Sequence, residues 1–432
     1  MADAALIKKL EAAVEANWEK QVAWLQTLVR FPSVRGKEGP CQDWLAREMA
    51  SRGWSVDRYT LAEVQMSHLP GYSPVMDTDY SQAVQVVGTV RSPSLSEGGQ
   101  KGKSLIVQGH VDVVPPGPEE MWQFPPFDPV ISGEWMNGRG CHDMKQGVSA
   151  FFWAMDALKT AGLAPASDVY VQTVTEEECT GNGALSTLAR GYRADAALVT
   201  EPTAGTLTRA HVGVMWFRLR IRGVPVHVAV ADTGTNAIMS AYKLLEELYG
   251  LTGRINARAK EHPIFKGMNN PVKFNPGVIR GGDWGSSTPA WCEVDCRIGL
   301  LEGTTLAQAR QEVLDTVAAA AKGDSFLANN PPEVIWNGFQ ADAFHLPEGS
   351  EAERVLAATH EAVYGETLKS HVSTGVADVR AYLNYYGIPA LCYGPKGEGA
   401  HAFDERAHLP SLKKNTLSVA AFIAEWCGVR AA

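Results

Sequence analysis

The sequence lacks the features of several protein classes. It has only seven cysteines in 432 residues and no Cys-x-x-Cys pair, which is typical of reduced thiols in the cytoplasm. No apolar run approaches the roughly 18 residues that a membrane-spanning helix requires. The net charge of −9 argues against a nucleic acid or an anionic membrane as a partner, because both require a basic surface. We therefore expect a cytoplasmic protein that binds neither.

The amino-terminal half has the pattern of an α/β protein. The chain length of 432 residues predicts two or three domains, and a hydrophobic content of 45% is that of a globular chain. Strand-like runs such as SLIVQGH (104–110) and DVYVQTV (168–174) alternate with helix-like segments such as KQGVSAFFWAMDALKTAG. This alternation predicts a mostly parallel sheet flanked by helices.

The pattern changes near residue 206. The run VGVMWFRLRIRG (212–223) alternates strictly, as expected for a half-exposed antiparallel strand. Helix-like and strand-like segments continue to residue 342, and the α/β pattern then resumes. We expect a catalytic domain formed by residues 1–206 and 343–432, and an inserted α+β domain, 207–342, that acts as a lid or dimerisation domain. The Ser-, Gly- and Lys-rich stretch 92–103 is expected to be an exposed loop.

Acidic residues and histidines follow several of the apolar runs. They are His110 and Asp112 in GHVDVVPPG, Asp143 in GRGCHDMKQG, Glu176, Glu177 and Glu178 in TVTEEECTGNGA, Glu201 in TEPT, and His401 in GPKGEGAHAFDERAHLP. In an open α/β sheet, ligands bind at the carboxyl ends of the strands. Two imidazoles and several carboxylates at that edge are the ligands of a pair of divalent metal ions, and one carboxylate can bridge both ions.

Each motif also has a simpler interpretation. Asp143 could cap a helix, because aspartate is frequent at that position. The three glutamates could form a solvated acidic turn, and Glu201 alone could be a surface acid. His142 could be a third histidine ligand, although a structural or wall-lining role is the stronger interpretation. His408 is the alternative to His401.

Taken together, the motifs resemble those of the dinuclear zinc amidohydrolases and peptidases that include acetylornithine deacetylase, succinyl-diaminopimelate desuccinylase and carboxypeptidase G. The resemblance extends from FPSV at residue 31 to the final helix. It implies that Asp143 bridges two metals, with His110 and Glu201 completing one site and Glu178 and His401 the other. It also implies that Asp112 assists His110 and that Glu177 is the general base.

The resemblance extends to the inserted domain. The histidine that matches His227 reaches the active site of the partner subunit in this family and polarises the substrate carbonyl. Here the surrounding motif has Asp232 near the usual proline, so a structural histidine is the alternative. Asn275 and Arg280 are candidates for binding a substrate carboxylate. The family's Thr-Asp segment is Val-Ala-Asp (376–378), which puts a family-standard substrate in doubt.

These observations predict a metal-dependent amidohydrolase that removes the acyl group from a small N-acyl amino acid or a related compound. Two divalent ions per subunit are expected, with Zn²⁺ first and Co²⁺ or Mn²⁺ as alternatives. The expected partners are a small-molecule substrate and a second copy of the chain, in a homodimer formed through residues 207–342. The alternatives are a di- or carboxypeptidase, an enzyme that removes an amino or acyl group from an aromatic substrate, and a catalytically silent binding protein.

Overall fold

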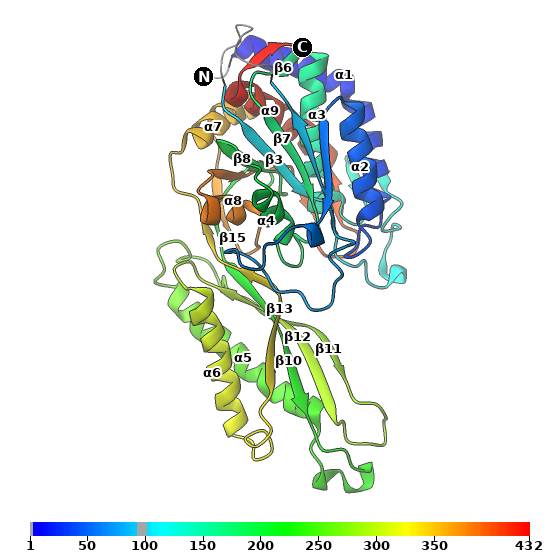
Figure 1. The fold of residues 1–432 in the computed structure, drawn as a ribbon, viewed down its shortest axis with the longest axis vertical. Coiled ribbons are helices and arrows are strands. Elements are labelled where there is room, and N and C mark those ends of the chain that lie inside the picture. Colours follow the sequence, from blue (N-terminus) through cyan, green and yellow to red (C-terminus); the bar gives the residue numbers. More distant parts are fainter. Residues whose placement is uncertain (1–2, 93–101) are drawn as a thin grey trace.

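The computed structural model of the protein describes residues 3–92 and 102–432 (Figure 1). The predicted loop at 92–103 lies almost entirely outside the described residues. Within the described ranges, no helix combines the length and the apolar character needed to cross a bilayer.

The larger part of the molecule is built around a six-stranded sheet with the strand order β1-β2-β7-β3-β8-β16. β7, β3, β8 and β16 are parallel to one another, whereas β2 is antiparallel to both β1 and β7 near one edge. The strands span Ser55–Thr60 (β1), Val84–Val90 (β2), Leu105–His110 (β3), Val169–Val174 (β7), Ala196–Val199 (β8) and Ala390–Cys392 (β16). The predicted α/β class is confirmed, and the antiparallel edge is the one departure from a parallel sheet.

Helices cover this sheet (Figure 1). They span Ala4–Val29 (α1), Gly39–Ser51 (α2), Gln146–Thr160 (α3), Asn182–Ala189 (α4), Glu351–Tyr364 (α7), Val379–Tyr386 (α8) and Leu409–Cys427 (α9). α1, α3 and α9 pack on one another, and α3 and α9 contact β3. α4 and α8 contact each other, and α8 contacts β8 and β16.

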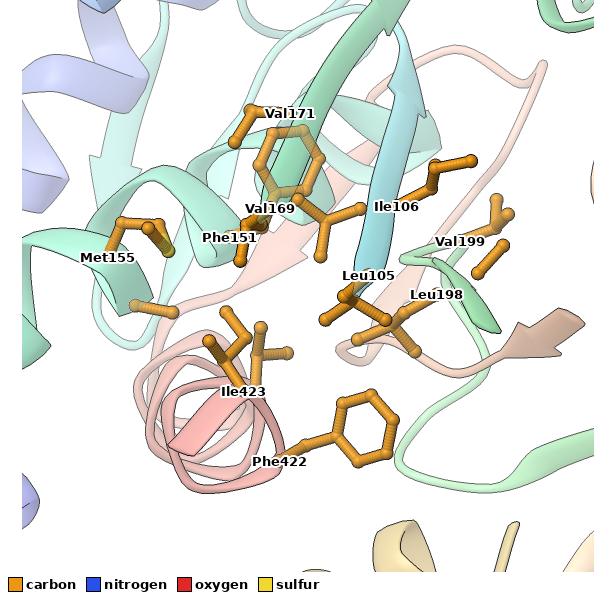
Figure 2. Close-up of a cluster of buried hydrophobic side chains, with 14 of the residues drawn as sticks. Leu105, Ile106, Phe151, Met155, Val169, Val171, Leu198, Val199, Phe422 and Ile423 are labelled. Carbon is orange, nitrogen blue, oxygen red and sulfur yellow. The ribbon is translucent and has the colours of Figure 1, made fainter. Parts of the chain in front are cut away.

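The main hydrophobic core lies between the sheet and the pair α3 and α9. Figure 2 shows Phe151 of α3 and Ile423 of α9 pointing toward Leu105 and Val169 of the sheet. All four side chains are completely buried. The central strands are apolar on both faces, as expected for parallel strands that helices cover, and this explains their continuous Val, Ile and Leu runs.

A second sheet, which is antiparallel and has the strand order β11-β12-β10-β13, lies below the six-stranded sheet in Figure 1. Its strands span Gly213–Arg222 (β10), Phe274–Gly281 (β11), Trp291–Leu300 (β12) and Glu333–Ala341 (β13), and its helices span Ala237–Ala259 (α5) and Leu306–Lys322 (α6). We call this group the four-stranded unit. Phe217, Leu219 and Ile221 of β10 are buried in its separate core. The predicted antiparallel alternation is therefore present in the structure.

Short strands complete the fold and connect the two parts. They span Val130–Ser132 (β4), Trp135–Asn137 (β5), Leu163–Pro165 (β6), Leu207–His211 (β9), Phe344–His345 (β14), Ser370–Ser373 (β15), Gly397–Glu398 (β17), Arg406–His408 (β18) and Val429–Ala431 (β19). β9 pairs with both β14 and β15, so the chain enters and leaves the four-stranded unit through one small sheet.

Candidate metal centre

The predicted acidic residues and histidines meet at the carboxyl end of the six-stranded sheet. His110 is the last residue of β3, the glutamates 176–178 follow β7, and Glu201 follows β8. These three strands are parallel neighbours, so the segments that follow them lie at the same edge. Asp143 lies in the turn Cys141–Lys145 before α3, and His401 lies between β17 and β18.

Asp143 lies between two groups of side chains. Its Oδ1 is 3.3 Å from Nε2 of His110, and that nitrogen is 3.8 Å from Oε1 of Glu201. Its Oδ2 is 3.7 Å from Nε2 of His401, and that nitrogen is 3.0 Å from Oε2 of Glu178. In each group of three residues, all the potential ligand atoms lie within 4.8 Å of one another. One carboxylate therefore belongs to both groups.

The three consecutive glutamates point in different directions. Glu176 has a left-handed backbone with φ of 67°, and its carboxylate accepts hydrogen bonds from Arg35 and Tyr80. Oε2 of Glu177 is 3.7 Å from Nε2 of His110. Glu178 contacts His401 instead. The triplet is therefore not a solvated turn, because Glu176 and Glu177 are buried and each carboxylate has its own environment.

Asp112 supports both groups. Its backbone carbonyl accepts a hydrogen bond from Nδ1 of His110 at 2.9 Å, which leaves Nε2 of that ring free to bind a cation. The Oδ2 atom of Asp112 accepts a hydrogen bond from the backbone N–H of Glu178 at 3.1 Å. Asp112 thus connects a residue of the first group with a residue of the second.

The electrostatics of the site fit bound cations. Burial raises the pKa of Glu177 and of Glu201 well above the ordinary value. Burial alone would also raise the pKa of Asp143, but the hydrogen bond from His110 lowers it to about 2. The hydrogen bond with Glu178 raises the pKa of His401 to about 9.

One buried atom also indicates a missing positive charge. Oε1 of Glu201 has no hydrogen-bond partner among the described residues, although it is shielded from solvent. A buried carboxylate oxygen without a partner is costly unless a cation neutralises it. Nitrogen and oxygen ligands of this kind are typical of zinc and similar divalent ions. The residues present therefore fit a metal centre.

A cavity of about 650 Å³ opens above these residues. Its floor includes Asp143, Glu177 and Glu201, and the four-stranded unit contributes its opposite wall. That wall includes Asn275 and the aromatic rings of Trp216 and Phe339, whose centroids are 5.5 Å apart at an interplanar angle of 81°. The rings make a flat apolar substrate possible.

Two other predicted residues lie outside this lining. Neither His227 nor Arg280 is among the described residues that line the cavity. His227 is exposed, and its Nδ1 accepts a hydrogen bond from the N–H of Ala229 at 3.1 Å. Arg280 is exposed and pairs with Asp295 at 3.3 Å, although Asp295 itself lines the cavity.

The two alternative histidines have structural contacts. His142 is buried, and its Nδ1 is 3.1 Å from Nε2 of Gln146. His408 caps α9, because its Nδ1 accepts a hydrogen bond from the N–H of Ser411. Within the described ranges, neither histidine belongs to a group that could hold a metal ion.

Three residues near the site were not identified from the sequence. Arg35 holds Glu176, Glu405 contacts the turn that carries Asp143, and Arg297 lines the cavity. Arg297 is half-buried, and burial lowers its pKa. Its only hydrogen bond among the described residues runs to the carbonyl of Thr374 at 3.5 Å. The single available signal for Glu405 was its position four residues after His401.

Both the sequence and the fold are similar to those of known proteins. The profile of peptidase family M20/M25/M40 matches residues 106–425. The N-formyl-4-amino-5-aminomethyl-2-methylpyrimidine deformylase of Halalkalibacterium halodurans is 28% identical over 450 residues, which cover 99% of each chain. The deformylase of the same name from Bacillus subtilis is 27% identical over 444 residues, which cover 98% of each chain.

Two dipeptidases of known structure share the fold. The dipeptidase Dug1p of Saccharomyces cerevisiae superposes with a TM-score of 0.78 at 14% identity, over 98% of each chain. Human carnosine dipeptidase 1 superposes with a TM-score of 0.74 at 13% identity, over 98% of this chain and 99% of the other. At these identities the likeness is one of fold.

Proposed function

Because this chain belongs to peptidase family M20/M25/M40 and is a metal-dependent amidohydrolase, we propose that it removes a short acyl group from a small amide whose amine carries an aromatic ring. One observation carries the proposal. The two oxygens of Asp143 face two ligand groups on the floor of a cavity whose opposite wall holds Trp216 and Phe339. Such a cavity combines the ligands for amide hydrolysis with an apolar surface for a ring.

We assign two divalent ions to the site, with Zn²⁺ expected and Co²⁺ or Mn²⁺ as alternatives. His110 and Glu201 would hold one ion, Glu178 and His401 the other, and Asp143 both. When bound, such ions polarise the amide carbonyl and make a water molecule more acidic. The oxygen of Glu201 that lacks a hydrogen-bond partner, and the Nε2 of His110 that faces Asp143 and Glu201, support this assignment.

The protein's own groups would move the proton. Glu177 also forms a candidate metal-binding group with His110 and Glu178, but we assign it as the base; its carboxylate lies 3.7 Å from His110. It would accept a proton from the attacking water and then donate that proton to the leaving amine. Asp112 would hold the His110 ring in the tautomer that leaves Nε2 free. Asn275 would contact the substrate, and Arg280 would act at the outer edge of the same strand face.

The substrate class follows from the relatives and the cavity together. The two bacterial relatives are named as deformylases of an N-formyl aminomethylpyrimidine, an amide of a one-carbon acid with a ring on its amine side. For this chain we propose an N-formyl or other short N-acyl derivative of an aminomethyl heteroaromatic compound. The T-shaped contact between Trp216 and Phe339 leaves an aromatic surface of that kind in the cavity.

An N-acyl amino acid or a dipeptide is the second candidate. Arg297 favours it, because a half-buried guanidinium without a carboxylate partner among the described residues suits a substrate carboxylate. Both candidates undergo the same hydrolysis and differ in what the four-stranded wall contacts.

We further propose a homodimer in which His227 reaches the partner's cavity and stabilises the developing oxyanion. The evidence that supports a dimer comes from the proposed inserted domain, residues 207–342. Its exposed apolar side chains include Met239, Tyr242 and Tyr249 of α5 and Val278 and Ile279 of β11. β11 is an edge strand, and such strands pair readily with a second copy. All seven cysteines are free, which supports the proposed cytoplasmic location.

The deciding experiment measures hydrolysis by the zinc- and cobalt-loaded protein. The substrates are an N-formyl aminomethylpyrimidine, its N-acetyl analogue, N-acyl amino acids and dipeptides. We expect the highest kcat/KM for the formyl heteroaromatic amide, complete loss after chelation, and recovery on adding Zn²⁺, Co²⁺ or Mn²⁺. A preference for dipeptides would replace the first candidate with the second. Full activity after verified metal removal would contradict both candidate functions.

A further inference from the structure

The carboxylate of Glu405, near the metal centre, accepts four hydrogen bonds. It lies four residues after His401, immediately before β18, and is 1% exposed. Its Oε2 accepts hydrogen bonds from Nη1 of Arg139 at 2.5 Å and from the N–H of Gly140 at 3.0 Å. Its Oε1 accepts hydrogen bonds from the backbone N–H groups of His142 and Asp143, both at 3.0 Å. A carboxylate offers about four acceptor positions, so Glu405 is saturated.

These bonds hold a turn that regular secondary structure does not stabilise. Asp143 has φ of −114° and ψ of 101°, outside the helical region, and Gly140 has the left-handed φ of 76°. The backbone carbonyl of Glu405 accepts a further bond from the N–H of Gly138 at 2.9 Å. Without Glu405, three buried N–H groups of this turn would lose their acceptor, and each such loss is unfavourable.

The same residue connects two ligands that are remote in sequence. The turn carries Asp143, which faces both groups, and Glu405 shares a short loop with His401. Displacing Asp143 would move one of its oxygens away from one group or the other. A site of this kind has to be held within about 0.5 Å of its working geometry.

We propose that Glu405 is a positioning residue that sets the spacing of the two metal sites by holding the Asp143 turn and the His401 loop as one unit. The inference rests on the proposed metal assignment. It differs from a general structural role, because it requires that the affinity of the folded protein for metal depends on Glu405. Glu405 contacts neither the substrate cavity nor a potential ligand atom among the described residues.

The test is Glu405→Gln, which keeps the shape but removes an acceptor and the charge. Stepwise Zn²⁺ affinities are measured by chelator competition, and the absorption spectrum of the Co²⁺-loaded protein reports ligand geometry. The weaker stepwise constant is expected to fall by about 10–100-fold, the usual effect of losing a group that orients metal ligands, with a changed Co²⁺ spectrum. Glu398→Gln is the matched control, because Glu398 is exposed and pairs with Arg406 in the neighbouring hairpin.

A second variant covers the case in which Glu405→Gln does not fold. Removing one charge of a buried pair leaves the other uncompensated, so Arg139→Gln combined with Glu405→Gln removes both. The same loss of affinity is expected in the double variant. If a folded variant binds both ions as tightly as the Glu398→Gln control, the proposed positioning role of Glu405 is wrong. If the wild-type chain binds no cation, the proposed function fails instead.

Discussion

The two walls of the cavity hold their side chains in different ways. Beside the floor residues Glu177 and Glu178, Glu176 is fixed by Arg35 and Tyr80, and Asp112 accepts a hydrogen bond from the N–H of Glu178. On the opposite wall, Arg218 forms a close pair with Asp295, whereas Arg297 has one long hydrogen bond, to the carbonyl of Thr374. The surroundings of the floor are therefore preorganised, as metal binding and proton transfer require, whereas the Arg297 part of the wall can adapt to a substrate. This difference implies that chemistry and specificity can be altered separately.

The largest expected effect comes from the floor. Glu177→Gln should retain bound metal but lower kcat by about 10²–10⁴-fold, the range for removal of a general base. Glu178→Gln should lose metal first, because its carboxylate contacts His401. Metal content and single-turnover rates distinguish the two variants. An exchange of these phenotypes would mean that the base and the ligand are assigned to the wrong glutamates.

A smaller effect is expected for His227, which does not line the cavity of its own chain. His227→Ala should lower kcat by about 10²–10³-fold, as loss of an oxyanion donor does, while metal content stays unchanged. Mixing Glu177→Gln with His227→Ala under subunit exchange should restore part of the activity, because one site in each mixed dimer is then intact. Verified exchange without any recovery would mean that His227 does not act across the interface.

The pH dependence of metal binding is the third prediction. Burial raises the pKa of Glu177 and of Glu201 well above the ordinary value, so the metal-free site binds protons more readily than exposed glutamates do. A cation must displace these protons, so the apparent affinity should rise with pH, by up to about tenfold per pH unit for each proton released. Calorimetric titration in buffers of different ionisation enthalpy measures this release. Binding without proton release would contradict the prediction.

The smallest effects are expected on the adaptable wall. Asn275→Ala should raise KM by about 2–10-fold, the effect of one hydrogen bond worth about 0.5–1.5 kcal/mol, with little change in kcat. Arg280→Ala should raise KM by less, because Arg280 is exposed and bonded to Asp295 at the outer edge. Steady-state kinetics of the two matched variants provide the test. A larger effect for Arg280 would place the substrate further from the metal centre than the cavity indicates.

Much of the floor could be predicted from the sequence because three of the motifs, those of His110, Glu176–Glu178 and Glu201, lie at or just after the ends of strands. Parallel pairing then brings the ends of β3, β7 and β8 to one edge, whatever the length of the intervening chain. The alternation in 212–223 likewise predicted a half-exposed antiparallel strand. These features depend on local pattern, which the sequence contains directly.

The remaining features depend on register and on backbone contacts. A bulge between Pro276 and Val278 shifts β11 by one residue, so Asn275 and Arg280 face the same side although five positions separate them. Asn275 lies opposite Arg297, nearer the cavity than Arg280, and no local pattern shows this. Glu405 escaped detection because its partners are mainly backbone N–H groups, which every residue except proline has.

The interruption of the six-stranded part by the four-stranded unit has a consequence for how the protein is made. Four of the proposed ligands, from His110 to Glu201, precede the unit in the chain, whereas His401 follows it. α9, which closes the core against α1 and α3, is later still. Chains are synthesised from the amino terminus, and segments fold as they emerge. The four-stranded unit is complete in the chain before His401 is made, so the full set of proposed metal ligands exists only when translation is nearly complete. The enzyme would therefore acquire the proposed ions as a finished chain.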